Sequence, residues 1–263
     1  MSFLKLLSAL VIALVLAATS AFAETAVDLE LVLAVDVSRS MDVDEQHLQR
    51  DGYVAALRHP DVVDAIRSGP LGRIAVTYVE WAGPQSQAVI LPWTIIDGAA
   101  AAKRVADLLS AAPLGRYTGT SISGGLLFAA ETLAKNSFAG TRRVIDVSGD
   151  GPNNRGLPVH PISTGITGSG ITINGLPLML KAPVQPYSIA DLDVYYEDCV
   201  IGGPGAFILV VQEKSQLAMA IKRKLVLEIA GTPPAVIHVA ETRHEPRIDC
   251  MIGERLIERW LEK

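Results

Sequence analysis

Apolar runs with the periodicity of strands alternate along the chain with segments of helical pattern. Strands are predicted where β-branched and aromatic residues cluster or alternate with polar ones, and helices where apolar residues recur every three or four positions. The predicted strands cover residues 29–36, 73–81, 87–96, 141–148, 171–178 and 206–211. The predicted helices cover residues 44–58, 61–67, 98–112, 121–135, 212–230 and 252–261. Residues 153–170 carry only a weak helical signal, and residues 191–199 fit a short helix or a turn.

The connections between the strands predict the sheet. Only residues 82–86 separate the second strand from the third, which is too short for a parallel crossover of a dozen or more residues. These two strands therefore form an antiparallel pair at one edge. The alternation of strands with helices elsewhere is typical of parallel pairing. We predict a doubly wound α/β fold, with a mostly parallel sheet, one antiparallel edge strand and helices on both faces.

The N-terminal segment has the pattern of a secretory signal peptide. Lys5 precedes an apolar stretch at residues 6–18, and the small-residue sequence 21–23 (AFA) marks a cleavage site near Ala23. This apolar stretch is shorter than the ~20 residues that span a bilayer, and no other segment approaches that length. We expect a periplasmic or secreted protein with no membrane span in the mature chain.

The remaining chain is long enough for one large domain. We assign residues 24–231 to this domain and residues 232–263 to a C-terminal tail. Cys199 and Cys250 are the only cysteines, and an even count in an exported chain favours a disulfide over free thiols. Such a bridge would tether the tail to the domain and contribute about 4 kcal/mol on the chain-entropy model.

The net charge argues against a nucleic-acid-binding protein. The full chain carries −5, and loss of Lys5 with the signal peptide makes it −6. The basic residues cluster only at positions 222–224 (KRK), where we interpret them as a solvated helix face.

The first strand ends in a set of oxygen-bearing side chains. Asp36 is followed by Ser38 and Ser40, and alternate residues of an extended segment project to the same side. Hard cations prefer such oxygen ligands. The alternative is a plain strand-to-helix turn, with Ser40 or Asp42 capping the next helix.

A second acidic loop favours the metal interpretation. Asp150 follows the fourth predicted strand, which neighbours the first at the switch point of a doubly wound sheet. Two carboxylates brought so close repel each other unless a cation lies between them. The hydroxyls of Ser38, Ser40 and Thr120 can complete the coordination shell. Asp36 and Asp150 together match the charge of a divalent ion.

Three segments together resemble the loops of von Willebrand factor A (VWA) domains, which form a metal-ion-dependent adhesion site. They are residues 36–41 (DVSRSM), 119–126 (GTSISGGL) and 148–151 (SGDG). The resemblance implies that the metal ligands are Asp36, Ser38, Ser40, Thr120 and Asp150, some of them acting through water.

The resemblance also implies that the ion keeps an open coordination position, which accepts a carboxylate from a protein partner or ligand. Thr118 is the rival to Thr120, but Thr120 keeps the family's spacing to the helix. We expect Mg²⁺, which suits few protein ligands plus waters, with Mn²⁺ and Ca²⁺ as alternatives. Acids at positions 42, 44 and 45 lie close by, and we interpret them as first-turn helix acids.

Further runs are similar to an uncharacterised family of exported bacterial VWA-like proteins. They are residues 148–154 (SGDGPNN), 171–176 (ITINGL) and 200–207 (VIGGPGAF). That family offers no activity to transfer. Two features depart from ordinary VWA domains, because Gly149 replaces a frequent Thr and the cysteine-containing tail is extra.

The leading hypothesis is a metal-dependent binding module and not an enzyme. The alternatives are a metal-assisted hydrolase, since an ion with open positions can activate water, and a structural protein with an empty site. The five histidines show no His-Glu-x-x-His spacing, and the chain has no Gly-x-Ser-x-Gly motif.

Overall fold

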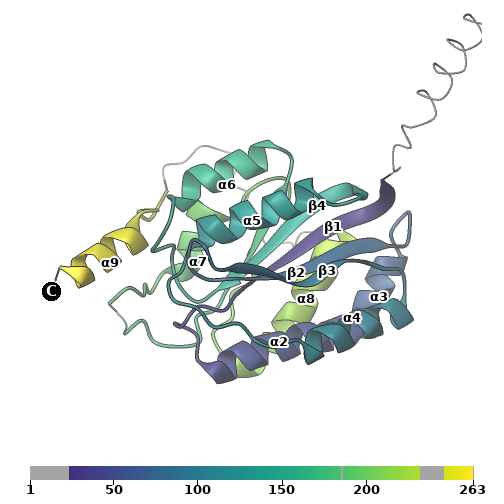
Figure 1. Ribbon diagram of the computed structural model, residues 1–263, viewed down its shortest axis with the longest axis horizontal. Coiled ribbons are helices and arrows are strands. Elements are labelled where there is room, and N and C mark those ends of the chain that lie inside the picture. Colours follow the sequence, from purple (N-terminus) through teal and green to yellow (C-terminus); the bar gives the residue numbers. More distant parts are fainter. Residues whose placement is uncertain (1–23, 185, 232–245, 263) are drawn as a thin grey trace, which may run out of the picture.

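The computed structural model describes residues 24–184, 186–231 and 246–262. Its centre is a five-stranded sheet of order β3-β2-β1-β4-β5 (Figure 1). The strands are β1 (Thr25–Asp36), β2 (Ile74–Trp81), β3 (Gln87–Ile96), β4 (Phe138–Gly149) and β5 (Thr172–Pro177). Only the β2–β3 pair is antiparallel within this sheet. The predicted fold class is confirmed.

Helices cover both faces of the sheet (Figure 1). One face carries α2 (Val43–Arg58), α3 (Pro60–Arg67), α4 (Ala99–Ala111) and α8 (Leu217–Ala230), which follows the short 3-10 helix η2 (Lys214–Gln216). The other carries α5 (Ile122–Ala134), α6 (Val159–Gly168), α7 (Leu192–Tyr195) and the π-helix η1 (Tyr196–Val200). Alternate residues of β1 supply the two cores, with Leu31 and Leu33 on one side and Val32 and Ala34 on the other.

The predicted strand at residues 206–211 is wrong as a regular strand. This segment runs beside β5 and forms isolated bridges only, at Ile208 and Val211. Pro177 of β5 has no backbone N–H to donate between the two bridges, and at the start of the segment the Asn174 side-chain oxygen accepts a hydrogen bond from the Phe207 backbone N–H at 3.1 Å. A side chain thus takes a donor that a regular ladder would use. Residues 153–170, which carry only a weak helical signal in the sequence, contain α6.

The basic cluster at residues 222–224 does not form a uniformly solvated face. Lys224 is fully buried in α8, and its ammonium contacts both Asp146 of β4 and Glu228 of α8. Asn174 donates a hydrogen bond to Glu228 at 3.0 Å. Only Arg223 of the cluster is exposed, so the interpretation from sequence was wrong for Lys224.

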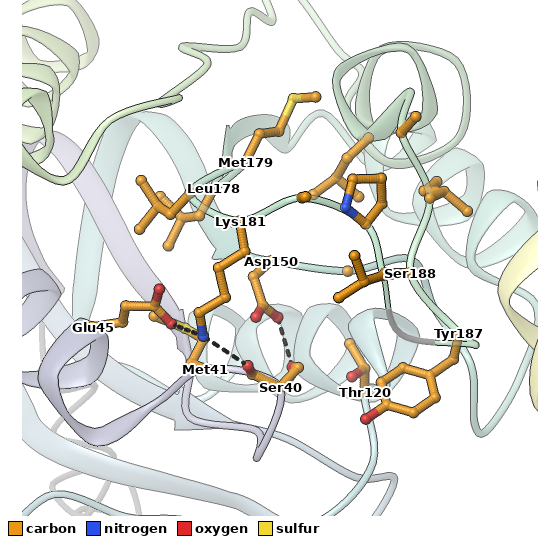
Figure 2. A pocket seen from close by; sticks show the side chains of 18 of the residues that line it. Ser40, Met41, Glu45, Thr120, Asp150, Leu178, Met179, Lys181, Tyr187 and Ser188 are labelled. Carbon is orange, nitrogen blue, oxygen red and sulfur yellow. Dashed lines mark hydrogen bonds and ion pairs between the residues drawn. The ribbon is translucent and has the colours of Figure 1, made fainter.

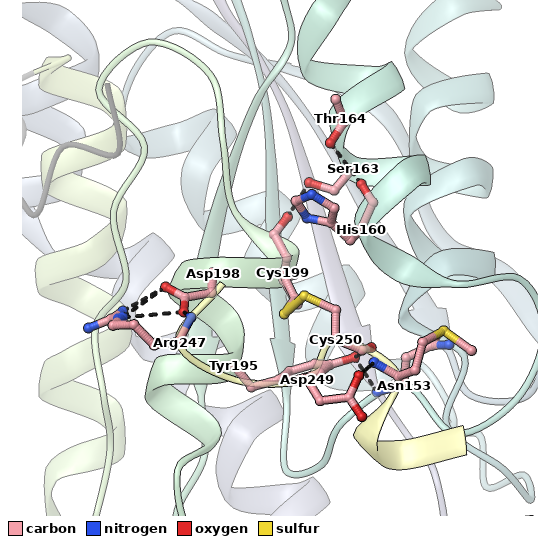
Figure 3. Close-up of a disulfide and its surroundings, with 12 residues drawn as sticks. Asn153, His160, Ser163, Thr164, Tyr195, Asp198, Cys199, Arg247, Asp249 and Cys250 are labelled. Carbon is pink, nitrogen blue, oxygen red and sulfur yellow. Dashed lines mark hydrogen bonds and ion pairs between the residues drawn. A yellow bond between two sulfur atoms is a disulfide. The ribbon is translucent and has the colours of Figure 1, made fainter. Parts of the chain in front are cut away.

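The predicted disulfide between Cys199 and Cys250 is confirmed, and it joins η1 to the segment before α9 (Ile252–Leu261) (Figure 3). Arg247 pairs with Asp198 beside it, with 2.8 Å between Arg247 Nη2 and Asp198 Oδ1. The end of the tail is therefore fixed to the domain. The predicted signal peptide, residues 1–23, lies outside the described residues. Within the described part of the chain, no helix combines the length and apolar character needed to cross a bilayer.

Candidate metal site

Asp36 is the last residue of β1 and is completely buried. β1 pairs with β4 through Val35 and Ser148, which brings Asp36 beside Gly149. One carboxylate oxygen, Oδ1, accepts a hydrogen bond from the Ser38 backbone N–H at 2.7 Å. The other, Oδ2, has no hydrogen-bond partner among the described residues. A buried carboxylate oxygen without a partner is costly, so this atom marks the place where a cation would be stabilising.

The two serines after Asp36 connect it to the second predicted acid. The hydroxyl oxygens of Ser38 and Ser40 lie 2.7 Å apart, and Ser40 donates a hydrogen bond to Asp150 Oδ1 at 2.6 Å. The structure thus brings together four of the five predicted ligands, from two loops far apart in sequence. The hydrogen of each hydroxyl can rotate away from the site, which leaves an oxygen lone pair free to bind an ion.

Thr120 reaches the same place from the loop before α5. Its side chain is buried, and it lines one pocket together with Ser40 and Asp150 (Figure 2), whereas Thr118 is exposed. The loop is braced by Asn154, whose side-chain oxygen accepts from Thr120 N at 3.0 Å and whose own N–H donates to Thr120 O at 2.9 Å. The structure therefore favours Thr120 over Thr118.

The neighbouring Asn153 ties this loop to the tail. Its side-chain oxygen accepts from Ser123 N at 3.0 Å, and its amide nitrogen donates to Glu254 of α9 at 2.6 Å. A Cβ atom on Gly253 would lie 2.0 Å from the Asn153 carbonyl oxygen, so only glycine permits this close approach. Both asparagines lie in the run SGDGPNN, but no local pattern of the sequence predicts these contacts.

The electrostatics of the site call for a cation. Burial raises the pKa of Asp36 well above its ordinary value, and the nearby Asp150 carboxylate raises it further. Burial also raises the pKa of Asp150, to about 6, against a lowering hydrogen bond from Ser40. A divalent ion between the two carboxylates would favour their charged forms. The donor set, two carboxylates and three hydroxyls, fits a hard divalent ion.

Among the described residues, no group of three or more His, Cys, Asp or Glu side chains forms a metal cluster. The proposed donor set has only two carboxylates, with hydroxyls as its other members. Such a set holds an ion with fewer charged ligands and leaves room for waters.

The acids after Ser40 take the helix roles expected of them, and one has a second contact. Asp42 caps α2, accepting from Glu45 N at 2.8 Å, while Asp42 N donates to Glu45 Oε2 at 3.0 Å. Asp44 is exposed in the first turn. Glu45 is buried and also pairs with Lys181 at 2.5 Å, so it connects α2 to the segment after β5.

Gly149 explains how this site departs from an ordinary VWA site. A Cβ atom at position 149 would lie 2.8 Å from the Tyr196 hydroxyl and 3.0 Å from Asp36 Oδ2. Both of these oxygens are buried, and neither has a hydrogen-bond partner in the described structure. Burial and the nearby Asp36 raise the pKa of Tyr196 well above its ordinary value, so the hydroxyl keeps its proton. Tyr196 thus occupies the space that a threonine at 149 would need.

A pocket of about 470 Å³ opens directly above the site (Figure 2). Ser40, Thr120 and Asp150 lie on its floor. Much of its wall comes from the segment after β5, and the apolar residues of this wall include Leu178, Met179, Leu180, Pro183, Val184 and Ile189. No sequence pattern pointed to this wall, because its residues form neither a helix face nor a strand.

Solved structures similar to this chain include proteins from very different organisms. Proximal thread matrix protein 1 (PTMP1) from the mussel byssus is 16% identical with a TM-score of 0.56, over 79% of this chain and 49% of its own. The pilus adhesin SpaC from Lactobacillus rhamnosus GG is 13% identical with a TM-score of 0.56, over 77% and 31%. A second PTMP1 structure, with a TM-score of 0.52, has a zinc-occupied MIDAS motif; it is 16% identical over 79% of this chain and 49% of its own.

This chain spans about half the length of PTMP1 and about a third of SpaC. At such low identity the likeness shows the fold alone. With the sheet order and helices described above, it defines a VWA-type fold. The chain belongs to the family described as "Protein of unknown function (DUF1194)", whose sequence model matches residues 26–233. A search of curated proteins finds no match.

Proposed function

We propose that this protein is an exported VWA-type module that binds a divalent metal ion and, through it, a carboxylate of a protein partner or ligand. Asp36, Ser38, Ser40, Thr120 and Asp150 would hold the ion, directly or through water. The bound ion would supply a Lewis-acidic position that accepts an anionic oxygen. Mg²⁺ is the proposed ion, with Mn²⁺ and Ca²⁺ as alternatives.

One observation carries this proposal. Asp36 and Asp150 are brought together in a buried site, and neither forms an ion pair with a basic side chain anywhere in the described structure. Asp36 Oδ2 has no hydrogen-bond partner in that part of the chain. Paired carboxylates without a resident cation are stabilised by one from solution. The zinc-occupied MIDAS motif of PTMP1 supports a divalent ion in a fold of this type.

Binding is favoured over catalysis by what surrounds the site. The described histidines, His47, His59 and His160, do not line the pocket above it. A hydrolase would need a free general acid or base within reach of the reacting atoms, whereas Glu45 and Lys181, which line the pocket, pair with each other at 2.5 Å. Metal-dependent turnover of phosphoester or peptide substrates would favour the hydrolase alternative instead.

Export is part of the same proposal. The predicted signal peptide and the Cys199–Cys250 bridge both suit an oxidising compartment outside the cytoplasm. PTMP1 is named as a matrix protein and SpaC as a pilus adhesin, and these names support a binding role in the periplasm or outside the cell.

Partner capture tests the proposal. The purified protein is used as bait for exported proteins with Mg²⁺ and, separately, with a chelator. We expect capture that is lost both with the chelator and in Asp36→Ala, while the fold survives. Asp44→Ala is the matched control, because Asp44 is an exposed acid on the adjacent helix turn. Capture that ignores both the chelator and Asp36→Ala would overturn the proposal.

A further inference from the structure

The five proposed ligands are not equally accessible. Asp36 and Ser38 are 0% and 1% exposed and lie beneath the site, whereas Ser40, Thr120 and Asp150 line the pocket above it. An ion held by this set has protein on its lower side. A ligand would therefore reach such an ion from the pocket, which Ser40, Thr120 and Asp150 line (Figure 2). Whatever binds such an ion must fit the pocket.

The wall of the pocket is apolar. Leu178, Met179, Leu180, Val184 and Ile189 form much of it, and its volume of about 470 Å³ is in the range of cavities that enclose small ligands. A carboxylate on a short polar side chain would leave this wall exposed to water. A carboxylate attached directly to an apolar body would cover it and gain the transfer free energy of that surface.

The charge of the lining restricts the ligand to a monoanion. Lys181 is the only basic residue that lines the described pocket. Its ammonium has three donors, and it lies 3.4 Å from Ser40 O, 3.2 Å from Asp42 Oδ2 and 2.5 Å from Glu45 Oε2. With these three acceptors around it, Lys181 has no spare donor for a ligand. A second negative charge, as on a phosphate, would have no counter-charge in the apolar surroundings.

The wall is held in place at both ends. Lys181 ties it to α2 through Glu45, and the ring of Tyr187 packs edge-to-face on Trp260 of α9, with 6.5 Å between the ring centroids. The tail helix is itself fixed by the disulfide and by Asn153. The tail that ordinary VWA domains lack therefore supports the wall of the pocket.

We propose that the pocket is the ligand subsite of this metal site, and that it takes a monocarboxylate attached directly to an apolar body. Two sources share this chemistry: a free organic acid and the C-terminal residue of an apolar peptide. The inference rests on the proposed function, because the ion supplies the anchor, and it narrows the ligand beyond an acidic side chain on a protein surface.

Calorimetric titration of the Mg²⁺-saturated protein tests the inference with four probes. We expect 3-phenylpropionate to bind at least about tenfold more tightly than acetate, which lacks the apolar body, or 3-phenylpropanamide, which lacks the charge. A short peptide ending in free leucine, compared with its C-terminal amide, tests the second source. Tighter binding of the free acid than of the peptide identifies the former as the preferred source, and the reverse order identifies the latter.

Pocket variants locate the binding. Val184 is 80% exposed and lines the pocket, so Val184→Asp should fold normally and weaken 3-phenylpropionate binding about tenfold. Leu108→Asp is the matched control, because Leu108 is 60% exposed and does not line the pocket. Trp260→Ala should weaken binding roughly two- to tenfold while Mg²⁺ affinity stays unchanged, which marks Trp260 as a positioning residue.

The outcomes separate this inference from the proposed function. Mg²⁺ binding combined with equal affinity for acetate and 3-phenylpropionate would overturn the subsite and leave the metal site intact. An internal aspartate peptide that binds as tightly as 3-phenylpropionate would also overturn it. Failure of Mg²⁺ itself to bind would overturn both. Tighter binding of 3-phenylpropionate that disappears in Val184→Asp, but not in Leu108→Asp, would establish the subsite.

Discussion

Two acids lie four positions apart at the end of β4: Asp146 is buried within the strand, and Asp150 is half-buried directly after it. They solve the same electrostatic problem differently. Asp146 is grouped with Glu228, and Lys224 lies between them with its ammonium 2.5 Å from Asp146 Oδ1. Asp150 is grouped with Asp36, and no basic residue of the described chain forms an ion pair with either. One pair of acids has its cation built into the fold.

This difference separates the acids that stabilise the fold from the acids that are available for function. Although burial by itself lowers the pKa of Lys224, the Asp146 and Glu228 carboxylates raise it above its ordinary value, so the lysine stays charged. The Asp146 group is complete without any ligand. The Asp36 group is incomplete, and it opens into a pocket at the carboxyl end of the sheet, where ligands bind in doubly wound folds.

The largest expected effect comes from removing the built-in cation. Lys224→Met leaves Asp146 and Glu228 buried without a counter-charge, and we expect a loss of about 3–5 kcal/mol in the free energy of unfolding. Chemical denaturation measures this loss. The matched control is Lys222→Met, whose pair with Asp61 is largely exposed and should contribute less than about 1 kcal/mol. Similar losses in both variants would contradict the assignment of Lys224.

The next effect tests the close approach of Gly149 to the Tyr196 hydroxyl. Gly149→Ala places a Cβ 2.8 Å from the Tyr196 hydroxyl, and we expect it to cost roughly 1–3 kcal/mol in the free energy of unfolding. Tyr196→Phe removes the contacting oxygen. The double variant should therefore recover part of the loss, and a double-mutant cycle by chemical denaturation measures the recovery. Strict additivity would show that Tyr196 is not the obstacle.

The group formed by Asp146, Glu228 and Lys224 should also make the stability of the fold depend on pH. Burial and the Asp146 carboxylate raise the pKa of Glu228 to about 7 from its ordinary 4.5, so the folded state binds this proton more tightly than the unfolded state. The contribution of Glu228 to stability is therefore most favourable below pH 4.5 and declines as the pH rises through 7. Between pH 5 and pH 8 the stability of wild type relative to Glu228→Gln should fall by roughly 1–3 kcal/mol. Parallel pH profiles would contradict this.

The smallest effect compares the Asp36 group directly with the Asp146 group. Asp36→Asn removes a buried charge that has no resident cation, so the metal-free protein should gain about 1 kcal/mol in the free energy of unfolding. The same variant should lose the thermal shift that Mg²⁺ produces in wild type. Asp146→Asn removes a partner of Lys224 and should instead lose about 1 kcal/mol or more. Changes of the same sign in metal-free protein would remove the distinction between the groups.

The sequence predicted the parts that depend on local pattern and strand order. Asp36 and Asp150 could be placed together because each follows a parallel strand and those strands are neighbours in the predicted order. Thr120 followed from its resemblance to the family loop. Their role as metal ligands stays a prediction.

The rest depends on contacts between distant segments that leave no local pattern. Lys224 follows two other basic residues, so its burial between Asp146 and Glu228 could not be seen from sequence. The strand predicted at 206–211 is not regular because Pro177 of β5 lacks a backbone donor and the Asn174 side chain accepts the Phe207 N–H. The sequence shows Gly149 as a departure from the family, and the physical reason for it lies in the position of Tyr196, which is distant in sequence.

Metal uptake by the purified protein tests directly whether the Asp36 group takes its cation from solution. Electron paramagnetic resonance of free Mn²⁺ counts the ions removed by metal-free protein, and Mg²⁺ competes for the same site. We predict saturable uptake of one ion per chain, displaced by Mg²⁺ and abolished in Asp36→Asn but retained in Asp44→Ala. Absence of uptake in wild type, or uptake that persists unchanged in Asp36→Asn, would contradict metal binding by the Asp36 group.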